Sequence, residues 1–188
     1  IGLPTEVDED IDAIAEMALR VLACMEEAGS KGKLTLSVNP FIPKPFTPFQ
    51  WLPMADKKVV QQRLRRLESL LKSQRRIEIL SEPPREAYVQ AVLARGDRRL
   101  APVLAAAAAK GGWRRFTACL KDAGLDEESY LYRQRSLDER LPWAHLDMGF
   151  NKDYLWQEWQ RAVKEAPTKG CFPGCRRCGI CREGREAW

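Results

Sequence analysis

The order of the apolar patterns in the first 80 residues is the feature that most restricts the fold of this chain. Apolar residues recur at helical spacing over 8–28, alternate with polar residues over 34–38, return to helical spacing over 57–72 and form a short strand pattern over 77–80. Residues 1–4 precede these patterns and are typical of the end of a strand. Strands and helices that alternate in this way predict βα units around a parallel sheet, which is an α/β fold.

The pattern changes after Pro83, where helical spacing replaces the alternation. Gly and Pro residues end the predicted helices, which cover residues 84–95, 98–110, 113–123 and 151–165. We therefore predict three parts of the chain: βα units in 1–82, a helical extension in 83–166 and a separate tail in 167–188.

The tail is defined by four cysteines with the spacing C-x3-C-x2-C-x2-C, namely Cys171, Cys175, Cys178 and Cys181. Spacers this short let successive thiolates converge on one centre, and the neighbouring arginines favour the thiolate form. Four cysteines can close a tetrahedral zinc site or hold a 4Fe-4S cluster. We predict a metal or iron–sulfur site, with zinc and iron–sulfur both open, and disulfides or unligated thiols as the alternative.

A proline-rich segment follows the predicted strand that ends at Val38 and Asn39. Its prolines fix the backbone dihedral φ and remove hydrogen-bond donors, so we expect a stiff, irregular loop over 39–51. In parallel α/β folds, ligands bind at the carboxyl ends of the strands. The loop, which includes Phe41, therefore either contributes to a ligand site or serves as a rigid structural strut.

Several segments of the chain are similar to one family of enzymes. The opening Ile1-Gly-Leu-Pro-Thr-Glu6 resembles the turn after a late strand in the barrels of radical S-adenosylmethionine (SAM) enzymes. Residues 37–51, with their closely spaced Pro and Phe residues, resemble a subgroup that carries a cobalamin-binding domain ahead of its barrel. Residues 95–99, the segment 141–143 with Gly149 and Lys152, and the terminal cysteines are similar to the same subgroup.

The resemblance implies a fold and a cofactor chemistry. It implies that residues 1–82 are the last βα units of an incomplete (βα) radical SAM barrel, followed by the mainly helical extension and the Cys-rich metal-binding tail. In such enzymes a 4Fe-4S cluster cleaves SAM to a 5′-deoxyadenosyl radical, and the resemblance to this subgroup implies cobalamin as a further cofactor of the intact enzyme. The residues that the resemblance assigns to the SAM and substrate cavity are Gly2, Pro4, Glu6, Val38, Asn39 and Phe41.

The expected partner of this chain is the half-barrel that holds the SAM cluster, in the same or another chain. Cys171, Cys175 and Cys178 repeat the C-x3-C-x2-C spacing that binds such a cluster, but they follow the βα units. We therefore interpret them as part of an auxiliary or structural centre, and expect the chain alone to be inactive. Its start at a strand end, without Met, is typical of a fragment or a processed chain. The substrate, a small molecule or RNA, is not identified.

A second interpretation is a zinc-stabilised helical module that binds RNA without catalysis. Residues 57–76 hold eight bases and residues 1–30 hold eight acids, an asymmetry that permits an anionic partner. The single histidine, His145, and the lack of a nucleophile elbow argue against a Ser-His or Cys-His hydrolase. No apolar run approaches the about 20 residues of a membrane span. The clustering of the cysteines favours a cytoplasmic protein.

Overall fold

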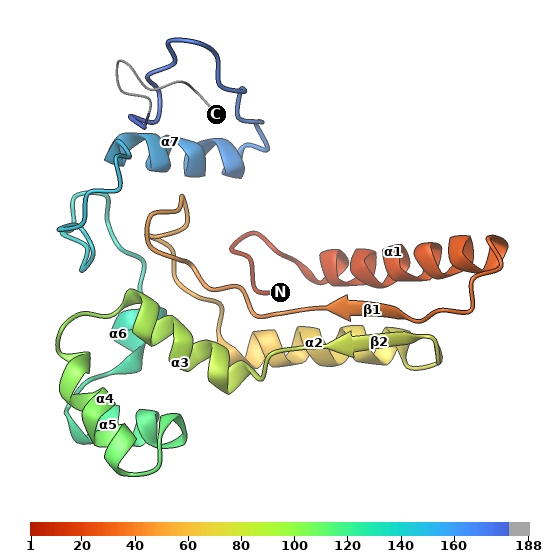
Figure 1. Ribbon diagram of the computed structural model, residues 1–188, viewed down its shortest axis with the longest axis horizontal. Coiled ribbons are helices and arrows are strands. Elements are labelled where there is room, and N and C mark those ends of the chain that lie inside the picture. Colours follow the sequence, from red (N-terminus) through yellow and green to blue (C-terminus); the bar gives the residue numbers. More distant parts are fainter. Residues whose placement is uncertain (181–188) are drawn as a thin grey trace. The chain divides into compact units, whose positions relative to one another are not determined.

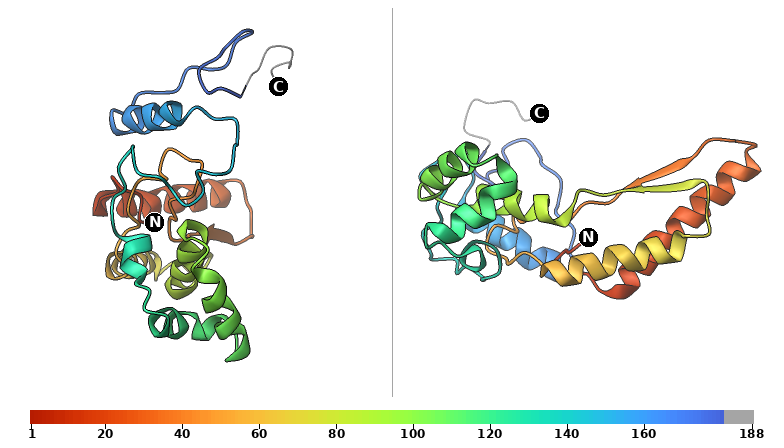
Figure 2. Two further views of the ribbon diagram at one scale, coloured as in Figure 1. Left: turned by 90° about the vertical axis from the view of Figure 1, so that its left-hand side faces the viewer. Right: turned by 90° about the horizontal axis from the view of Figure 1, so that it is seen from below.

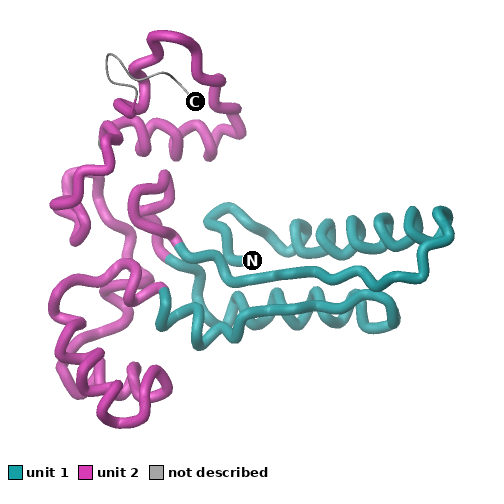
Figure 3. The backbone as a smooth tube through the Cα atoms, in the orientation of Figure 1, with its two compact units in different colours: residues 1–42, 54–90 teal, residues 43–53, 91–188 magenta. Residues whose placement is uncertain are grey.

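The structure is a computed structural model that describes residues 1–180, apart from the side chain of residue 152. The chain forms two compact units (Figure 3). Unit 1 holds Ile1–Ile42 and Met54–Gln90. Unit 2 holds Pro43–Pro53 and the chain from Ala91 onward, and the name proline-rich segment is used from here on for Pro43–Pro53. The loop Pro43–Pro53, which lies within the predicted βα part, thus belongs to a unit formed mainly by later residues, while our boundaries at residues 82 and 166 stay a prediction.

Unit 1 contains the predicted alternation of helices and strands. Its elements are helix α1 (Asp8–Glu27), strand β1 (Leu34–Ser37), helix α2 (Lys57–Leu71) and strand β2 (Ile77–Leu80) (Figure 1). The strands pair in parallel, with Leu34 opposite Ile77 and Ser37 opposite Leu80. The predicted βα order and parallel pairing are confirmed, whereas the barrel to which they would belong stays a prediction.

Both helices of unit 1 cover the same face of the two-stranded sheet (Figure 2). Successive strand residues point to opposite faces, so Leu34, Leu36, Ile77 and Ile79 pack against the helices. The helical spacing of the apolar residues gives each helix one stripe that faces these strand residues. The buried residues of this core are Ile11, Ala15, Ala18, Val38, Val60, Leu64, Leu67 and Leu71.

Helices make up the regular structure that is described beyond residue 83. All four predicted helices are present with ends within about three residues of the prediction. A fifth, of only five residues, was not predicted because it is too short to show a period. Among residues 1–180, no helix combines the length and the apolarity that crossing a bilayer requires. The elements are α3 (Pro84–Arg95), α4 (Leu100–Ala109), the 3₁₀ turn η1 (Trp113–Arg115), α5 (Phe116–Asp122), α6 (Glu127–Leu131) and α7 (Lys152–Val163).

The Arg-Gly-Asp sequence at 95–97 connects α3 to α4. A Cβ atom on Gly96 would lie 2.7 Å from the Val92 carbonyl oxygen and 2.1 Å from Leu100 Cδ1, so only glycine fits between the two helices. Asp97 Oδ1 accepts a hydrogen bond from the Arg99 backbone N–H at 2.9 Å, and the two side chains form an ion pair at 2.7 Å. The geometry of this segment is that of a helix-to-helix turn.

Arg95 is fully buried in unit 2 and donates to three backbone carbonyls. Its Nη1 donates to Pro43 O at 3.0 Å and its Nη2 to Leu52 O at 2.9 Å, and these two residues lie near opposite ends of the proline-rich segment. Its Nε donates to Tyr130 O in α6 at 3.0 Å. Burial, with a smaller contribution from Arg135, lowers the pKa of Arg95 to about 10, so it remains cationic at neutral pH. One guanidinium thus ties the proline-rich segment and α6 to the end of α3.

An aromatic cluster packs the proline-rich segment against later parts of unit 2. Trp51 is fully buried and belongs to one apolar cluster with the buried residues Leu141, Trp143 and Leu155. Its ring meets the ring of Trp156 edge-on, with 5.3 Å between centroids. Apolar contacts of large aromatic rings are among the strongest single contributions to a small core.

Replacing Arg95 by Lys should destabilise unit 2. An ammonium group cannot reach the three carbonyls that the planar guanidinium bonds, so at least one buried acceptor loses its partner. We expect Arg95→Lys to lower the free energy of unfolding by at least about 2 kcal/mol, measured by chemical denaturation. The exposed Arg98→Lys control should stay within about 0.5 kcal/mol of the unsubstituted protein. Equal stabilities of the two variants would contradict this role of Arg95.

Candidate functional site

Three segments of unit 1 that are distant in sequence meet at the carboxyl ends of the strands. The amino group of Ile1 donates to Asn39 O at 2.9 Å, and the Phe41 N–H donates back to Ile1 O at 2.7 Å. On the other side, the Glu82 N–H donates to Asn39 Oδ1 at 2.9 Å. Asn39 therefore joins the first residue of the chain to the segment that follows β2.

The two bonds at Ile1 have the pattern of a parallel ladder. In a parallel ladder, the N–H of a residue donates to the carbonyl of the residue before its partner, and its carbonyl accepts from the N–H of the residue after its partner. Ile1 bonds residues 39 and 41 in this way, so its partner is Pro40. The Val38 N–H donates to Leu80 O of β2 at 2.8 Å. Because the backbone groups of successive strand residues point to alternate edges, those of residues 39 and 41 point away from β2. Ile1 thus lies along the edge of this chain segment that β2 leaves open, whereas residues 1–4 are not assigned to a strand and residues 4–5 form a turn.

The structure separates the six residues assigned to the cavity. Gly2, Asn39 and Phe41 lie at the junction of the strand ends. The side chain of Val38 belongs to the apolar core beneath the helices, so only its backbone lies at the strand end. Pro4 is exposed in a turn. Gly2 has φ of +95°, a conformation that favours glycine, and a Cβ atom there would make a tight contact of 3.1 Å with Ala55 Cβ.

Glu6, the sixth of these residues, anchors the start of the chain to α2. Its Oε1 accepts hydrogen bonds from the Gly2 N–H at 2.8 Å and from Arg63 Nη1 at 2.8 Å. Arg63 Nη2 also donates to the Glu6 backbone carbonyl at 2.6 Å. Only 6% of the Glu6 side chain and 14% of the Arg63 side chain are exposed. Glu6 therefore positions the strand-end segment, since its carboxylate is already engaged within the protein.

Ion pairs within unit 1 join some of the basic residues of 57–76 to acidic residues of 1–30. Besides Arg63, Arg66 on α2 bonds Asp12 on α1 at 2.6 Å. Arg76, just before β2, lies 3.3 Å from Glu26 near the end of α1. Basic residues of the segment 57–76 thus neutralise acidic residues of the first helix, which reduces the positive charge available to a phosphate backbone.

The face of the sheet that the helices leave uncovered is mostly polar. Thr35 and Ser37 on β1 and Glu78 on β2 are exposed, and Thr35 lies opposite Glu78 in the register of the sheet. We did not predict these residues as part of a site, although the alternation of apolar and polar residues over 34–38 indicates that Thr35 and Ser37 share one exposed face. Together with Asn39 and the Glu82 backbone, they form a polar surface that leads to the strand ends.

Arg177 organises the loop that carries the first cysteines of the tail. Its guanidinium donates to the backbone carbonyls of Lys169 at 2.8 Å and Gly170 at 2.7 Å, and its Nε donates to Cys175 Sγ at 3.3 Å. The hydrogen bond from Arg177 lowers the pKa of the Cys175 thiol. A thiolate is the form of cysteine that binds metals. The loop around Cys175 is therefore arranged to stabilise a negatively charged sulfur.

The next turn of this loop is fixed to the start of α7. The Asn151 N–H donates to Cys178 O at 2.9 Å, and its side-chain amide donates to Arg177 O at 3.4 Å. Gly179 has φ of +85°, and a Cβ atom there would lie 2.9 Å from the carbonyl oxygen of Gly149. The two glycines and Asn151 thus let the cysteine loop contact the segment before α7, which is one of the segments that resemble the radical SAM subgroup.

The cysteines of this loop that the structure describes do not form a complete ligand set. Burial, and then the charges of Glu158 and Cys178, raise the pKa of Tyr154 on α7. Within residues 1–180, no group of three or more His, Cys, Asp or Glu side chains lies close enough to hold a metal ion. Cys181, the fourth predicted ligand, lies outside the described residues. The donor chemistry fits a thiolate-bound centre, because the loop already stabilises the Cys175 thiolate.

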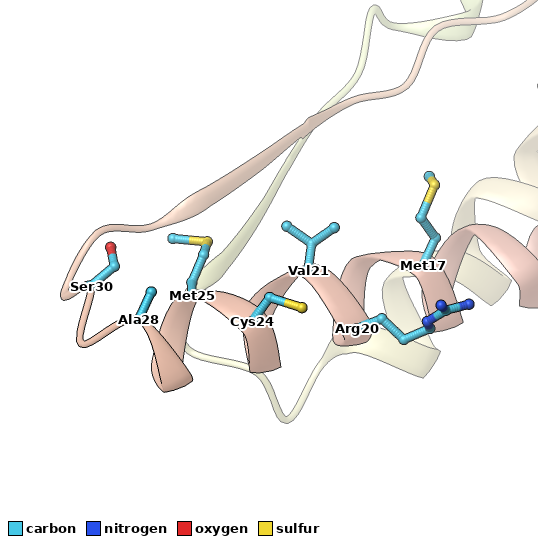
Figure 4. Close-up of a pocket in the computed structure, with 7 residues that line it drawn as sticks. All are labelled: Met17, Arg20, Val21, Cys24, Met25, Ala28 and Ser30. Carbon is cyan, nitrogen blue, oxygen red and sulfur yellow. The ribbon is translucent and has the colours of Figure 1, made fainter.

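A shallow hollow of about 580 Å³ lies on the side of α1, at its C-terminal half (Figure 4). Met17 and Val21 in this hollow are 57% and 41% exposed, which is unusual for large apolar side chains. With Cys24 and Ala28 they repeat at intervals of four, three and four residues, the spacing of a contact between two helices. The hollow is therefore shaped more like a helix-packing surface than like a catalytic site.

Comparison with known proteins finds similarity to a protein that is itself uncharacterised. The uncharacterised protein MJ0966 of Methanocaldococcus jannaschii is 33% identical to this chain over 106 residues, which is 55% of this chain. The match spans 21% of the relative, so the chain corresponds to about a fifth of that protein's length. No family model matches the chain, and no solved structure matches it.

Removing the charge of Glu6 should weaken unit 1 more than removing an exposed charge of the same kind. Glu6→Gln removes the nearer of the two carboxylates that pair with the mostly buried Arg63, the other being Asp8 at 3.5 Å, and we expect a loss of about 1–3 kcal/mol in the free energy of unfolding. Asp12→Asn breaks the exposed pair with Arg66 and should cost less than Glu6→Gln, because solvent screens an exposed ion pair. Thermal and chemical denaturation of the two variants measure the difference, and a larger loss for Asp12→Asn would refute the anchoring role of Glu6.

Proposed function

We propose that this chain is the C-terminal portion of a radical SAM iron–sulfur enzyme. Unit 1 forms one wall of the SAM and substrate cavity, and the cysteine segment carries an auxiliary metal or iron–sulfur centre. The observation that carries the proposal is the meeting of Ile1, Asn39 and Glu82 at the carboxyl ends of parallel chain segments. Carboxyl strand ends are where parallel α/β folds bind ligands, and these segments carry the resemblance to the family.

The residues at the strand ends would hold and orient the cofactor and the substrate. The backbone of 39–41 is fixed by its ladder to Ile1, so this wall requires little ordering when a ligand binds. The polar surface of Thr35, Ser37 and Glu78 would face the substrate. When bound to its cluster, SAM supplies the 5′-deoxyadenosyl radical, and the role of this chain is positioning and exclusion of water.

Two features of unit 1 support a further half-barrel as the partner. The edge of β1 opposite β2 is the edge along which Ile1 lies, so additional parallel strands would continue the sheet there. The apolar stripe of Met17, Val21 and Cys24 lies on α1, outside the core that α1 shares with α2, and a neighbouring helix would cover it. We propose that this half-barrel, in the same or another chain, holds the SAM cluster and any cobalamin.

The second interpretation, a helical RNA-binding module, gains no support from the described residues. Three of the eight bases in 57–76, namely Arg63, Arg66 and Arg76, are paired with acids of the first 27 residues. Paired arginines contribute less to phosphate binding, because a phosphate must compete with the carboxylate. The zinc alternative at the cysteines remains open, since four cysteines suit zinc as well as a cluster.

Metal analysis of anaerobically purified protein tests the proposed centre. We expect iron and acid-labile sulfide, lost on Cys175→Ser or Cys178→Ser because each substitution removes a thiolate ligand. Cys24→Ser and Cys119→Ser are matched controls, since these cysteines lie on α1 and α5, and both should retain the full metal content. Circular dichroism confirms that each variant is folded.

Three results would count against the proposal. Zinc without iron or sulfide would favour a structural site and remove the iron–sulfur assignment. Retention of the metal after Cys175→Ser and Cys178→Ser would place the centre elsewhere. An absence of bound metal in protein reconstituted with iron and sulfide under reducing conditions would refute a cysteine-bound cluster.

A further inference from the structure

Unit 2 contains a cavity of about 520 Å³ between the proline-rich segment and residues 138–155. Its volume falls within the roughly 300–1,000 Å³ of typical small-molecule sites. The residues that line it include no cysteine and no member of unit 1, so it is distinct from the cysteine loop and from the strand ends. Its walls are mainly apolar, and their large apolar residues are Phe46, Leu141, Trp143, Leu146, Met148, Phe150 and Leu155.

The aromatic walls of this cavity are held in place by one buried amide. Gln50 is only 4% exposed, and its Oε1 accepts hydrogen bonds from the Phe46 N–H at 3.1 Å and from Trp143 Nε1 at 2.7 Å. Phe46 has φ of +58°, a left-handed conformation that is rare outside glycine and persists only where the surroundings enforce it. The buried Arg135 lies against Trp143, with its guanidinium carbon 5.1 Å from the ring centroid. These walls therefore need little rearrangement to receive a ligand.

The rim of the cavity exposes three large apolar side chains within five residues. Leu146, Met148 and Phe150 are 51%, 53% and 38% exposed. The turn that carries them is closed by the Gly149 N–H, which donates to Asp147 Oδ1 at 2.7 Å. Single exposed apolar residues are common, but a group of them beside an aromatic-walled cavity marks a surface that a ligand covers. The ligand that suits this rim has an apolar body.

The charged residues that line the cavity favour a ligand without a net charge. Two of the lining carboxylates are engaged by the protein, because Asp147 closes the turn of the rim and Glu139 forms an ion pair with Arg133. The other charged residues of the lining are one acid and one base, Asp138 and Arg140, at exposed positions. Moving a charged group from water to apolar walls costs free energy unless the group is paired there. A neutral ligand avoids this cost.

We propose that this cavity binds a neutral small molecule that carries an aromatic ring. The ring lies against Phe46, Trp143 and Phe150, because aromatic rings gain from edge-to-face and offset contacts with one another. The bound molecule also removes Leu146 and Met148 from water, which is favourable for apolar surface. The site does not depend on the proposed SAM wall or on the cysteine centre, because none of its lining residues belongs to either.

Binding of three probes that share one ring tests the proposal on the 188-residue chain. Phenethyl alcohol is neutral, phenethylamine is a cation and phenylacetate is an anion at neutral pH, and each is titrated by isothermal calorimetry and by ligand-observed NMR. We expect the alcohol to bind at least about tenfold more tightly than either ion, because only the ions lose the hydration of a charge. An ion that binds as tightly as the alcohol, or an alcohol that shows no saturable binding, would overturn the proposal.

The indole N–H of Trp143 reports whether the alcohol enters the cavity. This group donates to the buried Gln50, so its NMR signal should shift as phenethyl alcohol is added. Trp113 is a matched control, since it is 46% exposed in η1 and does not line the cavity, and its signal should stay in place. Equal shifts of the two signals would show non-specific contact, and a shift of Trp113 alone would place the binding elsewhere. Either result would refute the site.

A substitution at the rim then locates the bound ring. Phe150→Ala removes one aromatic contact and should reduce the affinity for phenethyl alcohol by about fivefold. Leu104→Ala removes a similarly exposed apolar side chain on α4, away from the lining, and should leave the affinity unchanged. Equal losses in the two variants would contradict the proposal. Sedimentation should give the same mass for both variants and the unsubstituted chain, whereas a dimer lost only in Phe150→Ala would assign the rim to a second copy and overturn the small-molecule site.

Discussion

The parallel backbone pairing on both sides of residues 38–41 is the constraint on which unit 1 depends. Val38 bonds β2 on one edge, and Asn39 and Phe41 bond Ile1 on the other. Because strand side chains alternate between faces, this register places Val38 in the core and Thr35 and Ser37 on the uncovered polar face. A shift of one residue would exchange the two faces, so the position of every candidate ligand-binding group follows from this pairing.

Outside the regular elements, three arginines give the irregular segments their shape. Arg63 bonds the backbone and side chain of Glu6, Arg95 bonds the proline-rich segment and α6, and Arg177 bonds the cysteine loop. In each case one planar guanidinium donates to backbone carbonyls that have no strand or helix partner. These are also the segments that resemble the radical SAM subgroup. The likeness therefore includes residues that fix loop conformation as well as residues that would contact a ligand.

The sequence predicted the periodic parts of the fold and missed what depends on long-range contacts. The four elements of unit 1 and their parallel pairing followed from the spacing of apolar residues. The five-residue helix α6 shows no period, and the packing of the proline-rich segment into unit 2 depends on Arg95, which is 43 residues from Leu52. The contact of Asn151 with the cysteine loop could not be predicted from the sequence. Asn151 and Arg177 are 26 positions apart, and no sequence pattern links two residues at that separation.

Amide hydrogen exchange at Phe41 tests the central claim most directly, namely that Ile1 and residues 39–41 form a third parallel segment beside β1 and β2. The Phe41 N–H donates to Ile1 O in this pairing, and no helix or strand of unit 1 includes that residue. The account predicts that the Phe41 amide is protected to a degree comparable with Val38, whose N–H bonds β2. Exchange of the Phe41 amide at the rate of an unstructured peptide, with Val38 protected, would contradict it.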